Sequence, residues 1–192
     1  MSENIVKILD VGSSANSIAT TIYGHIPNLQ VTRLDISPEA EPDVLHDITQ
    51  PLPEELQGAF DIVLASHVIE HVDRDMVNVV MNHIASAVRN HGEVMVIVPS
   101  LEWACREILA GHENAGVQGI IFGAQRDKWD YHRCGFTLKA LRFMVELTGL
   151  VVRKAYQSPM MVSLYGHDYP AIQNVVIATR IDELNEVQDG SL

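Results

Sequence analysis

The stretch that decides the fold is Phe60-Asp61-Ile62-Val63-Leu64-Ala65-Ser66-His67-Val68-Ile69-Glu70-His71-Val72. Its first six residues are mostly apolar, which is typical of a short strand buried on both faces of a sheet. Polar side chains, among them two histidines, follow directly after this run. In open α/β sheets ligands bind outside the carboxyl ends of the strands, so the polar residues are candidates for a site.

Similar apolar runs precede and follow this stretch and alternate with helical patterns. The strand-like runs are residues 5–11, 29–36, 44–46, 94–98, 151–156 and 174–179. The helical patterns are residues 15–22, 76–88 after an N-cap at Asp73, 101–109, and 138–148 between a Thr137 cap and Gly149. This alternation predicts one α/β domain over residues 1–182, with a mostly parallel sheet covered by helices.

Residues 100–135 differ from the rest of the chain because polar and aromatic side chains replace the regular apolar pattern. After a short helix at 101–109 we expect a long irregular excursion, and insertions of this length often form a lid or a binding loop. The last ten residues, 183–192, are rich in acidic side chains and are expected to be a frayed tail.

The composition of the chain indicates which partners and which cellular compartment to expect. The chain has 192 residues, with 13 Lys and Arg against 25 Asp and Glu, and a formal net charge of −12. This acid excess argues against nucleic acids and anionic membranes as partners. The N-terminus lacks the apolar core of a signal peptide, no window approaches about 18 apolar residues, and two cysteines make no disulfide framework. We therefore expect a cytoplasmic protein, and the oligomeric state stays open.

The turn after the first strand is Asp10-Val11-Gly12-Ser13-Ser14. A dinucleotide fingerprint would need glycines at 12, 14 and 17, and only Gly12 is present; the ending of a P-loop is also missing. Asp35 stands 25 residues after Asp10, near the offset at which a carboxylate receives ribose hydroxyls. The turn thus suits a ribose-bearing ligand without a pyrophosphate. A plain strand–helix turn with a solvated Asp35 remains the alternative.

These motifs resemble those of the class I S-adenosylmethionine-dependent methyltransferases, the type 11 group among them. The similarity extends in order from residue 4 to about 99, and residues 60–72 are its most specific part. A weaker similarity covers residues 132–137 and the helix after them. The family's turn reads Asp-x-Gly-x-Gly-x-Gly, whereas this chain has Ser14 and Asn16 at the later glycine positions. The resemblance implies a three-layer Rossmann-like fold with a seven-stranded sheet and an antiparallel pair at its edge.

The resemblance also implies roles for individual residues in binding S-adenosylmethionine. Asp35 would accept the ribose hydroxyls, and Asp47 would accept from the adenine amino group. The methionine end would lie against Asp10 and residues 12–14 (Gly12, Ser13, Ser14), the adenine ring would pack on Ile36 and Ile48, and Ser66 and His67 would lie beneath the sulfonium.

His67-Val68-Ile69-Glu70-His71 also matches the inverted zinc-hydrolase motif His-x-x-Glu-His. A zinc hydrolase needs that motif inside a continuous helix and a third ligand, for which only the distant Glu146 is available. Because the motif follows a strand-like run directly, we expect no metal, and Glu70 and His71 are expected to brace the turn. The zinc hydrolase is kept as an alternative.

Transfer of an activated methyl group requires positioning and exclusion of water, and a general base only if the acceptor must lose a proton. The candidates for that base are His67, Asp127 and His132. Arg126 and Arg133 could clamp an anionic acceptor or form local salt bridges, and the rings of Trp103, Trp129 and Tyr131 could face an acceptor or anchor the insertion. The expected acceptor is a small molecule or a glycan-like compound. A relative that binds the cofactor without catalysis is the third hypothesis.

Overall fold

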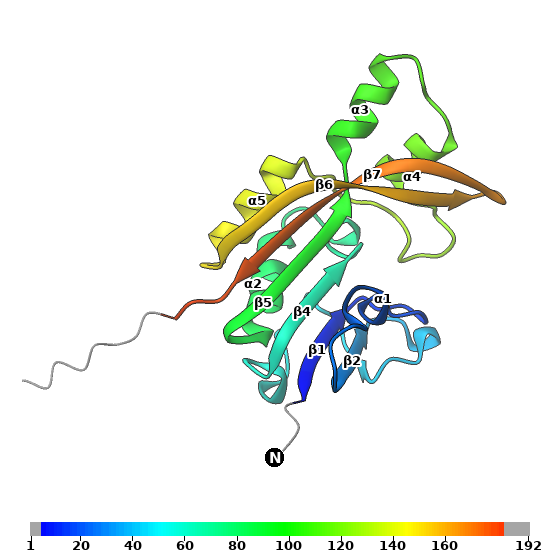
Figure 1. Ribbon diagram of the computed structural model, residues 1–192. Helices are drawn as coiled ribbons and strands as arrows, with labels where there is room; N and C mark the ends of the chain where they lie inside the picture. Colours follow the sequence, from blue (N-terminus) through cyan, green and yellow to red (C-terminus); the bar gives the residue numbers. More distant parts are fainter. Residues whose placement is uncertain (1–4, 183–192) are drawn as a thin grey trace, which may run out of the picture.

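The computed structural model describes residues 5–182, and the expected acidic tail at 183–192 lies outside them. Seven strands form one sheet in the order β3-β2-β1-β4-β5-β7-β6. The strands are β1 (Val6–Val11), β2 (Leu29–Asp35), β3 (Val44–Leu45), β4 (Phe60–Ser66), β5 (Val88–Pro99), β6 (Val151–Leu164) and β7 (His167–Thr179). The first five pair in parallel, and β7 is antiparallel to both β5 and β6 (Figure 1). The predicted mixed sheet with an antiparallel pair at its edge is confirmed.

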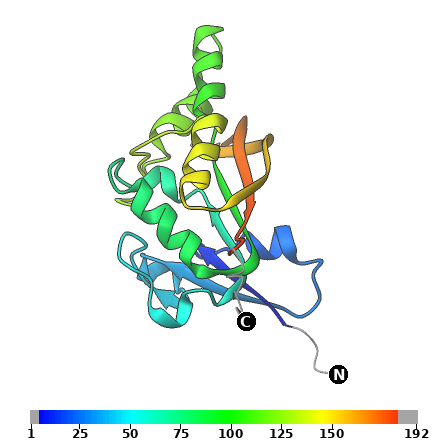
Figure 2. The ribbon, with the colours of Figure 1, turned by 90° about the vertical axis from the view of Figure 1, so that its left-hand side faces the viewer.

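Helices cover the two faces of the sheet unequally (Figures 1 and 2). One face carries α2 (Val77–Ala87) and α5 (Leu138–Leu147), whose apolar side chains join the largest core cluster. The other face carries the five-residue α1 (Ala19–Tyr23), with a smaller cluster beneath it. Three short 3-10 turns, η1 (Pro38–Ala40), η2 (Glu54–Leu56) and η3 (Ile69–His71), connect the strands.

The region of residues 100–135 is more regular than expected. Besides the predicted α3 (Leu101–Leu109) it contains a second helix, α4 (Ala115–Phe122). This helix packs with α3 against the outer half of the β6–β7 hairpin, around a small cluster of buried side chains. That hairpin extends well past the predicted strands at 151–156 and 174–179.

Two helix starts differ from the sequence-based expectation. The first helix begins at Ala19 and not near residue 15, because the residues before it are taken up by the turn after β1. The predicted cap at Asp73 is wrong: α2 begins at Val77 after Met76, and the Asp73 carboxylate instead pairs with Arg133 at 2.7 Å. By contrast, the Thr137 side chain accepts a hydrogen bond from Ala140 N and caps α5 as predicted.

None of the described residues forms a helix that is long and apolar enough to cross a membrane.

Candidate functional site

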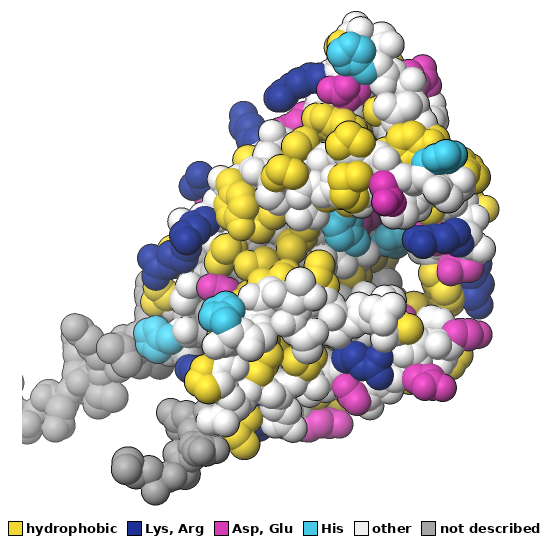
Figure 3. All heavy atoms as spheres, turned by 45° about the vertical axis from the view of Figure 1, so that its right-hand side comes forward, with side chains coloured by type: hydrophobic (Ala, Val, Ile, Leu, Met, Phe, Trp, Pro, Cys, Tyr) yellow, Lys and Arg dark blue, Asp and Glu magenta, His cyan; other side chains and the backbone are white. Residues whose placement is uncertain are grey.

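A cavity of about 990 Å³ opens at the carboxyl ends of β1, β2 and β4. The strand order reverses between β1 and β4, and this is where open α/β sheets bind their ligands. The outer hairpin and the loop of residues 123–136 form the opposite wall. Figure 3 shows this hollow in the surface, with histidine side chains inside it.

The turn after β1 brings the backbone close to the cavity. Gly12 has φ +66°, and a Cβ at this position would lie 2.3 Å from Val68 Cγ2, so a larger residue does not fit without a shift. Ser14 also adopts a left-handed conformation, with φ +48°. Ser14 therefore holds, at some conformational cost, a backbone geometry that glycine would adopt freely.

Asp35 ends β2 and fixes this turn. Its Oδ2 accepts from the backbone N–H of Ser14 at 2.9 Å, and its Oδ1 accepts from that of Ser37 at 2.8 Å. Each carboxylate oxygen has a second lone pair, so Asp35 can still accept hydroxyl groups from the cavity that it lines.

Asp47 lies in the loop after β3 and also lines the cavity. Its Oδ1 accepts from the backbone N–H and the hydroxyl of Thr49, at 2.9 and 2.8 Å. Among the described residues no hydrogen bond reaches its Oδ2, which is free to accept from a ligand. Ile36 and Ile48, each the residue directly after one of these carboxylates, also line the cavity, so a flat ring flanked by polar groups fits the lining.

The turn after β4 holds three charged or titratable side chains. His67 has φ +55°, its Nε2 lies 3.0 Å from Gln173 Oε1, and its Nδ1 lies 3.2 Å from Glu70 Oε1. Burial alone would lower the pKa of His67, but the Glu70 carboxylate outweighs burial and raises it. Burial would likewise raise the pKa of Glu70, yet the rings of His67, His71 and His132 lower it. Glu70 is therefore ionised although its side chain is almost completely buried.

The loop after α4 supplies the remaining candidates. His132 donates through Nδ1–H to Ile120 O at 2.9 Å, and burial lowers its pKa. Asp127 Oδ1 accepts from Trp129 N at 2.7 Å, and Arg126 forms a salt bridge with Asp130 at 2.7 Å. The local salt bridges that the sequence allowed are thus present for both Arg126 and, through Asp73, Arg133.

Most of the predicted site residues line this one cavity. They are Gly12, Ser14, Asp35, Ile36, Asp47, Ile48, Ser66, His67, Arg126, Asp127 and His132. Three of the predicted site residues, Asp10, Ser13 and Tyr131, do not line the cavity. Asp10 is buried beneath the turn, where its Oδ2 accepts from the Ser17 hydroxyl at 2.5 Å, and Ser13 is buried beside it. The Tyr131 side chain is exposed away from the lining, and its carbonyl oxygen lies 3.2 Å from His71 Nδ1.

Sequence reasoning missed the wall formed by α4 and the hairpin. Gly119 and Ile120 of α4 and Met160–Ser163 of β6 line the cavity opposite the strand ends. The apolar pattern of residues 117–121 was the available signal for α4. Sequence reasoning also passed over Gln173, which positions His67 from 106 residues away.

Comparison with known proteins agrees with this geometry. A family model described as "Methyltransferase domain" matches residues 5–155. A S-adenosylmethionine-dependent methyltransferase from Methanosarcina mazei superposes with a TM-score of 0.65 at 15% identity, covering 94% of this chain and 95% of that one. A Burkholderia thailandensis 1,6-didemethyltoxoflavin-N1-methyltransferase with bound S-adenosylhomocysteine superposes with a TM-score of 0.59 at 14% identity. The superposition covers 93% of this chain and 72% of that one. No curated protein matches the chain by sequence. The chain belongs to the methyltransferase-domain family and has the Rossmann-like fold of the S-adenosylmethionine-dependent methyltransferases.

Proposed function

We propose that this enzyme transfers a methyl group from S-adenosylmethionine to a small-molecule acceptor bound between the strand ends and the β6–β7 hairpin. One observation carries the proposal: Gly12, Asp35, Asp47 and Ser66 all line a single cavity at the point where the strand order reverses. The Burkholderia thailandensis neighbour, whose structure contains the small molecule 1,6-didemethyltoxoflavin beside S-adenosylhomocysteine, supports the acceptor class.

The cofactor supplies an activated methyl group bonded to a positively charged sulphur. The residues bind and orient it: Asp35 accepts the ribose hydroxyls, Asp47 Oδ2 accepts from the adenine amino group, and Ile36 and Ile48 cover the ring. Asp10 supports the turn from below, through the Ser17 hydroxyl, and does not line the cavity. A lone pair of the acceptor forms the new bond to the methyl carbon, while the electrons of the broken carbon–sulphur bond return to sulphur.

Positioning supplies most of the rate in such a displacement, because the methyl group is already activated. The wall formed by α4, the hairpin and residues 123–136 excludes water and holds the acceptor. His67 and His132 are the groups near the cavity floor that can receive a proton from a hydroxyl or amine acceptor, and His132 suits this role because burial keeps its pKa low.

Titration calorimetry with S-adenosylhomocysteine tests the proposal. The wild-type protein is expected to bind one equivalent, and Asp35→Asn to bind at least about tenfold more weakly through loss of charge-assisted hydrogen bonds. Asp61→Asn is the matched control, because Asp61 also accepts a backbone N–H, from Lys7 at 2.8 Å, but at the opposite end of the sheet. Equal affinities for the two variants, or no binding by the wild type, would contradict the proposal.

A further inference from the structure

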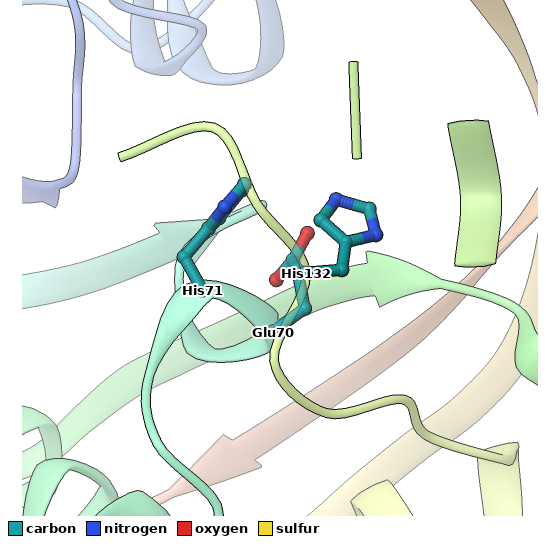
Figure 4. Close-up of side chains that lie close together, drawn as sticks. All are labelled: Glu70, His71 and His132. Carbon is teal, nitrogen blue, oxygen red and sulfur yellow. The ribbon is translucent and has the colours of Figure 1, made fainter. Parts of the chain in front are cut away.

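Glu70, His71 and His132 form a cluster at the floor of the cavity. One potential ligand atom from each lies within 4.8 Å of the others. Glu70 and His71 come from η3, and His132 comes from the loop after α4 (Figure 4). In that view the Glu70 carboxylate lies between the two rings. We propose that these three side chains bind a divalent transition-metal ion, with Zn²⁺ the ion that the donor set favours.

The carboxylate of Glu70 is the first argument. Its side chain is only 2% exposed, and neither oxygen accepts a hydrogen bond from the described residues. His67 Nδ1, at 3.2 Å from Oε1, forms an ion pair with it when that ring is protonated, but without the geometry of a hydrogen bond. A buried carboxylate normally has hydrogen-bond donors or coordinates a metal, because leaving it unpaired is costly. A bound cation would satisfy the two oxygens that His67 leaves without a hydrogen bond.

The two histidine rings are the second argument. His71 Nδ1 lies 3.2 Å from Tyr131 O, and His132 Nδ1 lies 2.9 Å from Ile120 O. A carbonyl oxygen only accepts, so Nδ1 carries a proton in both rings, and in the neutral ring Nε2 keeps a lone pair. Histidines that bind metal through one nitrogen are usually oriented in this way by a hydrogen bond from the other. Each ring is thus held in the tautomer that a metal ligand requires.

The third argument is the number and kind of ligands. Two imidazole nitrogens and one carboxylate oxygen match zinc sites that keep a fourth position open, whereas Mg²⁺ and Ca²⁺ prefer oxygen ligands alone. Ligands at about 2.0–2.2 Å from zinc lie about 3.3 Å apart, so the side chains need to draw together by about 1.5 Å. His71 and His132 both line the cavity, so the open position faces it. If the proposed function holds, an oxygen of the acceptor takes that position, and His132, whose Nε2 then binds the metal, is not the base.

Neighbouring groups support the cluster without joining it. His67 approaches Glu70 from the side and is held by Gln173, which makes it a positioning residue for the carboxylate. The Cys134 thiol lies 3.3 Å from Ile69 O and donates to that backbone oxygen. The backbone N–H of Arg133 donates to Glu70 O at 2.8 Å and fixes the loop that carries His132 beside η3. The site differs from the His-x-x-Glu-His motif, because His132 takes the place of His67.

The test uses chelator-treated full-length protein, titrated with Zn²⁺ and separately with Co²⁺. We expect one equivalent of Zn²⁺, and with Co²⁺ the visible absorption of a four-coordinate site. His132→Ala and Glu70→Gln are each expected to weaken Zn²⁺ binding at least 100-fold. His112→Ala is the matched control, because His112 also lies beside a carboxylate, Glu107 at 3.2 Å, but on the exposed surface. That variant is expected to bind zinc as the wild type does.

Absence of stoichiometric zinc binding, or equal zinc affinity in His132→Ala and His112→Ala, would overturn the proposal. Because Glu70 is buried, circular dichroism checks that Glu70→Gln folds, and the more exposed His132 keeps the test valid if it does not. Titration of the same metal-free protein with S-adenosylhomocysteine separates the two proposals. A protein that binds the nucleoside but fails to bind zinc would contradict the metal site alone, and a protein that binds zinc but fails to bind the nucleoside would contradict the methyltransferase assignment alone.

Discussion

The backbone N–H of Ser14 donates to the carboxylate of Asp35 at 2.9 Å and ties the end of β1 to the end of β2. One side chain therefore shapes the glycine-poor turn and also presents lone pairs to the cavity. This bond explains how the turn keeps a ligand-binding geometry although two of the family's glycines are replaced.

Replacing Ser14 by glycine should not harm the protein. The left-handed backbone costs a non-glycine residue about 1–2 kcal/mol, and the more flexible unfolded chain offsets about half of this gain. We expect Ser14→Gly to raise the melting temperature by roughly 2 °C and to keep its affinity for S-adenosylhomocysteine. Ser14→Val is the control and should lower the melting temperature. A destabilised Ser14→Gly would show that the serine hydroxyl matters more than the backbone conformation.

The role of Asp47 can be tested with an altered ligand. S-inosylhomocysteine lacks the adenine amino group, so it cannot donate to Asp47 Oδ2 and should bind the wild type about tenfold more weakly than S-adenosylhomocysteine. In Asp47→Asn the Thr49 contacts to Oδ1 can persist, but an amide nitrogen, which donates hydrogen bonds, replaces Oδ2. The preference for the adenine ligand should then disappear in calorimetry. A preference of the same size in both proteins would remove Asp47 from the adenine site.

Asp10 gives a pH-dependent contribution to stability. Burial raises the pKa of its carboxyl above the ordinary value, although the Ser17 hydroxyl opposes this. The folded protein then binds the proton more tightly than the unfolded chain, so this contribution is greatest below the ordinary pKa and is lost as pH rises through the raised value. Asp10→Asn should therefore be more stable than the wild type at pH 7 in denaturant titrations, with the difference shrinking toward pH 3. A less stable variant at pH 7 would contradict this account.

The two cysteines should differ in reactivity. Cys105 is exposed, whereas burial raises the pKa of the Cys134 thiol to about 11. At pH 8 about one Cys134 in a thousand is a thiolate, and the thiolate is the reactive form. Mass spectrometry after treatment with iodoacetamide should find one alkylated residue, Cys105, in the native protein and two in urea. Rapid native alkylation of Cys134 would mean that residues 132–137 open readily.

The central strands and the polar residues at their ends could be predicted from the sequence, because buried parallel strands are continuous apolar runs and their ends are marked by Asp35 or Ser66. Helix α4 was missed although residues 117–121 are mostly apolar, because Gly116 and Gly119 are poor helix formers and weaken that signal. Tertiary packing favours glycine at both positions: a Cβ at Gly116 would lie 2.3 Å from Tyr169 Cβ, and a Cβ at Gly119 would lie 2.6 Å from Leu164 Cδ1, which would have to move.

Long-range contacts also explain the other differences between the sequence-based expectation and the structure. The outer half of the β6–β7 hairpin was not predicted because it contains Pro159 and Pro170, and proline rarely occurs inside strands. The cluster of Glu70, His71 and His132 joins residues about sixty positions apart, and local spacing indicated only His67, Glu70 and His71. Asp73 pairs with Arg133 across the same distance, which no helix-capping rule anticipates.

A crystal structure of the protein with S-adenosylhomocysteine tests the central claim most directly. The account predicts ribose hydroxyl oxygens within hydrogen-bond distance, about 2.5–3.0 Å, of the Asp35 carboxylate, and the sulphur above Ser66 and His67. Density for the nucleoside elsewhere, or a ribose that does not contact Asp35, would contradict it.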